Sequence, residues 1–164
     1  MSLDALLLEK LANWRPDSAR ETLNVDDAVG GWNAAVTAEH VDVVGCRLWE
    51  LTLRRNTEAP TVELAARARH VCERVTGLLE PLCLVEVDAP RQIALLRSEQ
   101  PGQRGEERFY YEVLLEGNGG AALRRYQTPH AGKPRRQQVS FTLTHEALAK
   151  LVRDLCQQAV SSRQ

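Results

Sequence analysis

Apolar and polar residues alternate with a period of two through most of residues 82–143, and this pattern constrains the fold more than any other. Successive side chains of a strand point to opposite faces, so the alternation predicts half-buried strands. The strands that we expect here are residues 82–88, 91–98, 108–116, 121–127 and 136–143. Short polar connections, including Gly117-Asn118-Gly119-Gly120, predict hairpins and therefore an antiparallel meander of four to five strands.

Three other segments have helical periodicity. We expect helices at residues 3–14, at 61–79 and after Thr144, because apolar residues recur there every three or four positions. Thr61 and Thr144 suit the N-cap position of the second and third helix. The apolar stripes of these helices predict that Val75 and Leu151 are buried at helix–sheet contacts.

Two further strands are expected between the first two helices, at residues 32–38 and 41–55. Both faces of the second are apolar around Gly45, which predicts a bulge or bend there. Residues 17–31 are rich in Asp, Asn and Gly and are expected to be mostly loop.

Together these elements predict a single α+β domain over residues 1–164, with 161–164 frayed. The order is helix, two strands, helix, meander, helix, with the helices packed on one face of the sheet. This order resembles that of small dimeric binding domains, including chaperones of the secretion type. The resemblance implies a homodimer, although such chaperones are distinctly acidic and this chain has a net charge of −1.

The cysteines and the N-terminus indicate where the protein is found. The four cysteines are widely separated and form no CxxC pair, so we expect reduced, mostly buried thiols and no zinc ribbon. Residues 1–10 lack the basic start and long apolar run of a secretory signal. Arginine outnumbers lysine 18 to 3, which is typical of a GC-rich bacterial genome. The chain is therefore expected to be bacterial and cytoplasmic, and no membrane span is expected.

Combinations of residues that could carry chemistry are few. His40 and Asp42 could share a face of a strand, but a stable metal site needs three or four ligands. His70 and Cys72 do not face each other on a helix. The acidic residues of the meander match a glycosidase pair no better than solvated strand faces; they are Glu86, Asp88, Glu112 and Glu116. We therefore expect no catalytic residue, no metal and no cofactor.

One segment has an unusual charge distribution. No acidic residue occurs from Gly117 to His145, and the cations of this segment gather around two expected strands. We call six of its residues the basic rim: Arg124, Arg125, Tyr126, Lys133, Arg135 and Arg136. Neighbouring strand residues face opposite sides, so Arg124 and Tyr126 are expected on one face and Arg125 on the other. Residues 1–50 carry a net charge of −5 and residues 51–164 one of +4, so the acidic part could pair with the rim within or between chains.

These observations favour a non-enzymatic protein-binding or assembly module that associates with a partner or with itself. One alternative is that the basic rim binds nucleic acid or another anionic ligand. The near-neutral net charge argues against nucleic acid. A second alternative is a small-ligand binder or enzyme whose site is assembled from scattered residues, with His40, Asp42, His145 and Glu146 as first candidates.

Overall fold

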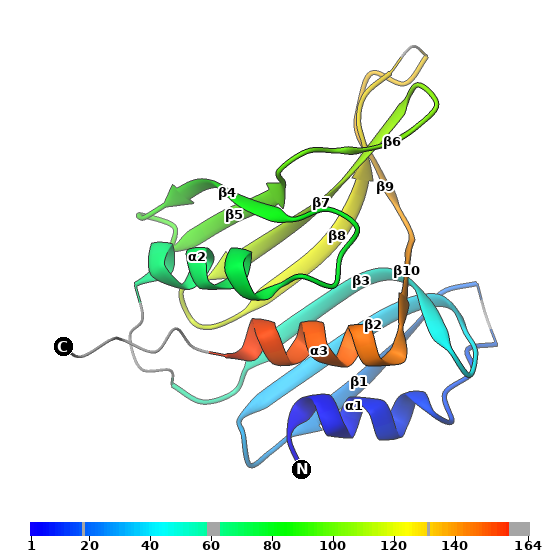
Figure 1. Cartoon of the computed structure of the whole chain (residues 1–164). Helices are drawn as coiled ribbons and strands as arrows, with labels where there is room; N and C mark the ends of the chain where they lie inside the picture. Colours follow the sequence, from blue (N-terminus) through cyan, green and yellow to red (C-terminus); the bar gives the residue numbers. More distant parts are fainter. Residues whose placement is uncertain (18, 59–62, 131, 158–164) are drawn as a thin grey trace.

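The computed structural model describes residues 1–17, 19–58, 63–130 and 132–157, which form three helices and a large antiparallel sheet (Figure 1). The α+β class and the antiparallel pairing agree with the sequence prediction. In chain order the elements are α1 (Leu3–Leu11), β1 (Glu21–Asp27), β2 (Trp32–Val41), β3 (Gly45–Arg55), α2 (Leu64–Arg74), β4 (Leu82–Asp88), β5 (Ile93–Ser98), β6 (Gly102–Arg104), β7 (Glu107–Glu116), β8 (Ala121–Gln127), β9 (Gln137–Val139), β10 (Phe141–Thr144) and α3 (His145–Cys156).

The strands follow the order β1-β2-β3-β8-β7-β5-β4, and three short strands extend this path. β6 pairs with β7, β9 pairs with β8, and β10 pairs with β3. β3 and β8 pair directly only through Leu51–Leu53 and Ala121–Leu123. Beyond these residues the two strands separate, and the segment 137–144 bridges them, first along β8 and then along β3.

The helices cover apolar residues that alternate along the strands. α1 and α3 lie side by side over β1–β3, and α2 packs on β4 and β5 (Figure 1). Val75 and Leu151 are buried as predicted, at 3% and 4% exposed, but Val75 lies just past the end of α2 rather than on a helix face. None of the helices in the described residues is long and apolar enough to cross a membrane.

Two helices are shorter than predicted. α1 ends at Leu11 rather than at residue 14, and α2 ends at Arg74 rather than at 79. Val75 takes an extended backbone with ψ of 103°, so the apolar residues that follow it line a connection instead of a helix. The side chain of Thr144 accepts a hydrogen bond from the Ala147 amide at 3.1 Å, which confirms the cap of α3. Thr61 and residues 158–164 lie outside the described residues.

The prediction of a loop over residues 17–31 is wrong, because Glu21–Asp27 form β1 at an edge of the sheet. Three strands, not two, therefore precede α2. The acids and Asn24 misled the prediction because an edge strand of a half-buried sheet tolerates polar residues on its solvent face. Val25 is buried, and the Asp27 carboxylate accepts a hydrogen bond from the Gly30 amide at 2.8 Å in the following turn.

The expected strand at 41–55 is interrupted by a tight turn. Asp42 Oδ1 accepts hydrogen bonds from the amides of Val44 (2.8 Å) and Gly45 (2.9 Å). A Cβ at Gly45 would lie 2.6 Å from the Leu143 carbonyl oxygen, so glycine lets β3 and β10 approach. The expected strand at 136–143 is likewise divided at Ser140 into β9 and β10, and Gly102–Arg104, between two expected strands, form the short strand β6.

Candidate functional site

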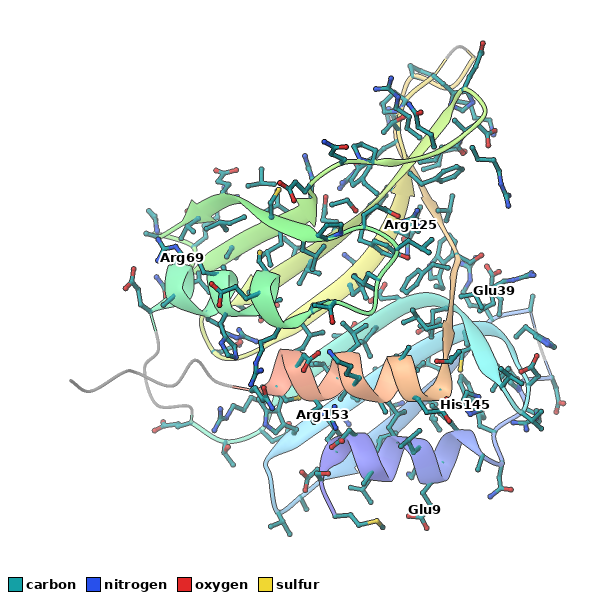
Figure 2. The ribbon with its side chains drawn as sticks, viewed as in Figure 1. Glu9, Glu39, Arg69, Arg125, His145 and Arg153 are labelled. Atoms are coloured by element: carbon teal, nitrogen blue, oxygen red, sulfur yellow. The ribbon has the colours of Figure 1, made fainter. Side chains whose placement is uncertain are left out.

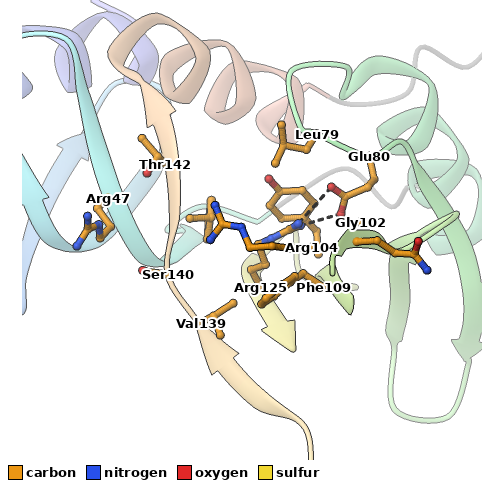
Figure 3. Close-up of a pocket in the computed structure, with 13 residues that line it drawn as sticks. Arg47, Leu79, Glu80, Gly102, Arg104, Phe109, Arg125, Val139, Ser140 and Thr142 are labelled. Carbon is orange, nitrogen blue, oxygen red and sulfur yellow. Dashed lines mark hydrogen bonds and ion pairs between the residues drawn. The ribbon is translucent and has the colours of Figure 1, made fainter. Parts of the chain in front are cut away.

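A cleft of about 730 Å³ lies beside the segment 137–144, where β3 and β8 separate (Figure 3). Its lining comes from six strands and from the connection between α2 and β4. Three aromatic residues and three arginines dominate the lining: Phe109, Tyr111, Phe141, Arg47, Arg104 and Arg125. A mixed apolar and polar lining of this volume is typical of ligand sites.

A buried ion pair holds one of these arginines in place. Both partners are nearly inaccessible, with Arg125 7% and Glu80 8% exposed. The Arg125 guanidinium donates to both carboxylate oxygens of Glu80, at 2.7 and 3.2 Å. Ser98 Oγ donates to the same carboxylate at 3.1 Å and accepts from the Tyr111 amide at 2.8 Å. The cleft thus contains a fully hydrogen-bonded charge pair, which fixes the direction of Arg125.

Aromatic rings support the Arg125 side chain. Its guanidinium carbon lies 4.1 Å from the centre of the Tyr111 ring and 5.9 Å from that of Phe109. Phe141 meets Tyr111 edge to face, with ring centres 5.5 Å apart. Burial raises the pKa of the Tyr111 hydroxyl above its ordinary value, so this ring stays neutral. Rings stacked on a guanidinium add cation–π attraction to the ion pair.

The backbone of β6 lies directly against the ion pair. A Cβ added to Gly102 would lie 3.2 Å from Glu80 Oε2 and 3.3 Å from one terminal guanidinium nitrogen of Arg125. Glycine at this position therefore lets β6 approach the Glu80–Arg125 pair closely. Residues 102–108, 127–130 and 132–137 form an arm that stands away from the rest of the molecule (Figure 1). Gly102 marks the base of this arm.

The other two arginines give the cleft an excess of positive charge. Arg47 and Arg104 are exposed, and neither forms an ion pair with any residue that the structure describes. Figure 3 shows Arg104 near the Glu80–Arg125 pair and Arg47 across the 137–144 segment from it. Glu80 balances only one of the three guanidinium groups. The cleft is therefore suited to a ligand that carries negative charge.

The basic rim is divided between two faces, as the alternation predicts. Arg125 lines the cleft, whereas Arg124 lies on the opposite face and donates to Glu50 at 3.0 Å. This bond helps to lower the pKa of Glu50 below its ordinary value, against the raising effect of burial. Tyr126 stacks on Tyr110 with ring centres 5.8 Å apart, and the Arg136 guanidinium lies 3.9 Å from the Tyr126 ring.

Most arginines of the basic rim already have carboxylate partners. Arg136 donates to the buried carboxylate of Glu112 at 2.5 Å, and this bond raises the pKa of Arg136 above its ordinary value. Lys133 reaches the Gln137 side chain at 3.3 Å on the exposed arm. Of the rim cations, Lys133 and Arg135 alone have no carboxylate partner among the described residues.

Three of the other candidates, His40, Asp42 and His145, lie near one another at the turn after β2, where both histidines act on the charge of Asp42. His40 and Asp42 lie 3.9 Å apart in an exposed position. The backbone amides of Gly45 and Val44 lower the pKa of Asp42, as expected for a turn-forming carboxylate. His145 is buried at the start of α3, while Glu146 beside it is exposed. The described residues contain no group of three or more His, Cys, Asp or Glu that could hold a metal ion.

Cys72, His70 and the acids of the meander form no catalytic arrangement with one another in the described residues. Burial raises the pKa of the Cys72 thiol to about 11, which keeps it protonated near neutral pH. His70 lies on the same helix, and its Nε2 is buried without a hydrogen-bond partner in the described structure. Among the meander acids, Glu112 is engaged by Arg97 and Arg136. Glu86 and Asp88 lie two strands away on β4, so these acids do not form a pair across a cleft.

Four charged residues of the described part of the chain line the cleft. The sequence analysis singled out one of them, Arg125, and missed Glu80, Arg47 and Arg104. Glu80 lies just before Pro81, one residue past the predicted helix 61–79, in the connection between α2 and β4. Arg47 belongs to a strand about 80 residues from Arg125 in the chain. The only sequence signal for Arg104 was its polar loop with two glycines, Gly102 and Gly105. Only the sheet topology brings these residues together.

No protein-family model matches the chain, and comparisons with curated proteins and with solved structures give no significant match.

Proposed function

We propose that the chain is a non-enzymatic, cytoplasmic binding module, and that its cleft receives an acidic segment of a partner protein. The observation that carries this proposal is the charge of the cleft. Three guanidinium groups face one carboxylate, Glu80, over a floor of aromatic rings. Acidic side chains would find unpaired cations at Arg47 and Arg104, and apolar side chains would bury the floor.

A macromolecular partner fits the surroundings of the cleft better than a small molecule does. Leu79 lines the cleft and its side chain is 82% exposed, so a partner protein could bury this apolar side chain on binding. The arm, whose base at Gly102 lines the cleft, has further exposed cations at Lys133 and Arg135. A partner protein that enters the cleft would contact both of these regions. Interfaces commonly combine such an apolar contact with a charged periphery.

The contacts of the basic rim disfavour the nucleic-acid alternative. Arg124, Arg125 and Arg136 are each bound to a carboxylate within the chain. A phosphate bound at these three arginines would have to displace their carboxylates, so the basic rim offers few free cations to nucleic acid.

A peptide-display selection tests the proposal. Random peptides selected on the wild-type protein should be enriched in Asp and Glu together with apolar residues. The Arg104→Glu variant should lose this acidic enrichment, because it replaces an unpaired cation of the cleft by an anion.

Arg69→Glu is the matched control. Arg69 is an exposed arginine on α2, remote from the cleft in Figure 2, so its reversal changes the net charge equally and should keep the acidic enrichment. Selected peptides without acidic bias, or an acidic bias that survives Arg104→Glu, would contradict the proposal.

A further inference from the structure

We infer that the partner segment binds by strand addition to the edge of residues 137–144, pairing with the backbone at Gln138, Ser140 and Thr142. The inference rests on the proposed function and specifies how the acidic segment is held.

The segment 137–144 pairs along one edge only. β9 pairs with β8 alone and β10 pairs with β3 alone, within the part of the chain that the structure describes. Ser140, between them, has no cross-strand partner in either ladder. The opposite edge of this eight-residue segment is therefore free of strand pairing.

Hydrogen bonds at the end of β10 show which residues face the free edge. The His145 amide donates to the Val44 carbonyl oxygen at 3.1 Å, so the backbone of residue 145 faces β3. Alternate residues of an antiparallel strand direct their backbone groups to the same edge. Leu143 and Phe141 therefore also face β3, and Thr142 faces the free edge.

The same reasoning applies to β9. The Thr128 amide donates to the Arg108 carbonyl oxygen at 2.9 Å, so the even-numbered residues of β8 face β7. Arg125 then faces β9, where its partner is Val139. Val139 consequently directs its backbone groups to β8, and those of Gln138 point to the free edge. Gln138 thus directs its backbone groups away from β8, and Thr142 directs its own away from β3, on either side of Ser140.

This edge lacks the devices that keep other edges from pairing. Residues 137–144 contain no charged residue and no proline. The outer edges of the sheet differ, because β1 carries Asp26 and Asp27, and β4 carries Glu86 beside a register shift. Charges and bulges protect edge strands from unwanted pairing. An unprotected edge is suited to an added strand.

The free edge also borders the cleft, which selects the chemistry of the added strand. Val139, Ser140 and Thr142 line the same cavity as Arg47 and Arg104. Alternate side chains of a strand share one face, so a strand added here directs every second side chain toward the cleft. Acidic residues at those positions would meet the unpaired arginines.

The test uses an eight-residue peptide of alternating glutamate and valine, with a lysine–valine peptide as the control. Proline removes the backbone N–H and is tolerated at an edge position whose N–H faces solvent. Thr142→Pro should therefore fold but bind the glutamate peptide at least tenfold more weakly than Thr142→Val, which keeps the N–H. Fluorescence anisotropy measures both affinities, and the melting temperature of each variant checks its fold.

Amide exchange provides a second measurement that needs no variant. In the free protein the amides of Ser140 and Thr142 should exchange faster than that of Leu143, which faces β3. The glutamate peptide should slow exchange at Ser140 and Thr142 at least tenfold. Unchanged exchange at both amides, in a sample where the peptide binds, would overturn strand addition.

The outcomes separate this inference from the proposed function. The glutamate peptide could lose affinity for Arg104→Glu and yet bind Thr142→Pro and Thr142→Val equally well. This result would support the cleft as a site for acidic segments and would refute strand addition. If the glutamate peptide binds the Arg104→Glu variant as tightly as it binds the wild type, the proposed cleft for acidic segments is refuted. The same holds if the lysine–valine peptide binds the wild type as tightly as the glutamate peptide does. If the wild-type protein is a dimer and Thr142→Pro is a monomer, the edge pairs with a second copy of the chain. This result would overturn the proposal that a segment of a partner protein binds there.

Discussion

Arg125 combines a buried ion pair with a place in the lining of the cleft. Its charge is neutralised by Glu80, and its ring contacts with Tyr111 and Phe109 fix its position at the floor of the cleft. Removing the charge of one partner would leave the other charge buried. The sequence placed Arg125 on the correct face, but its partner is 45 residues away and was not predictable from spacing.

Glu80→Ala should lower the free energy of unfolding by about 3–5 kcal/mol, because it leaves the guanidinium of Arg125 buried without its counter-charge. Urea denaturation followed by circular dichroism measures this loss. Glu39→Ala is the comparison, since it breaks an exposed ion pair with Arg20 whose atoms are 3.3 Å apart. That loss should stay below about 1 kcal/mol. Equal losses in the two variants would mean that the Glu80–Arg125 pair is not buried in solution.

At the scale of elements, periodicity predicted most of the fold. β4 and β8 have the predicted bounds, because their alternation is regular and their turns contain Pro or Gly. β1 was missed because an edge strand has one polar face and little apolar content. Residues 136–143 were predicted as one strand, since the change of pairing partner at Ser140 depends on where β3 and β8 separate. Local sequence contains no information on that separation.

Leu151→Ala tests the packing of α3 against the sheet. The truncation should cost about 2–5 kcal/mol of unfolding free energy, because it removes buried methyl groups and leaves a cavity. Chemical denaturation of purified protein provides the value. Glu146→Ala, at an exposed position in the first turn of α3, should cost no more than about 1 kcal/mol. A loss below about half a kcal/mol for Leu151→Ala would contradict the packing of this helix face.

In the molecule as a whole, the charge difference between the two parts of the chain is partly neutralised internally. Glu50 pairs with Arg124 at 3.0 Å, and Asp4 lies 3.8 Å from Arg153. Both ion pairs join the acidic first 50 residues to the basic remainder. Composition predicted that such a pairing could form within or between chains, and only the structure shows these two pairs within one chain.

The contacts of the basic rim also lead to a prediction about salt dependence. Four free arginines on duplex DNA would give a slope of log affinity against log salt of roughly −3 to −4. With Lys133 and Arg135 as the remaining rim cations, we expect the rim itself to contribute a slope no steeper than about −2 to any oligonucleotide binding. Titration of a labelled duplex at several salt concentrations measures it. A slope steeper than about −3, together with loss of oligonucleotide binding in the Arg135→Ala/Arg136→Ala double variant, would support the nucleic-acid alternative.

The bridging position of residues 137–144 also determines how the chain can fold. Phe141 pairs with Leu48, about ninety residues earlier, so the bridge closes one of the longest loops in the fold. Such closure costs entropy before any contact compensates for it, and folds dominated by distant pairings form slowly. Without residues 137–144, direct strand pairing between β1–β3 and β4–β8 in the described residues is limited to Leu51–Leu53 with Ala121–Leu123. Completion of the sheet is therefore a late event in the folding of the nascent chain.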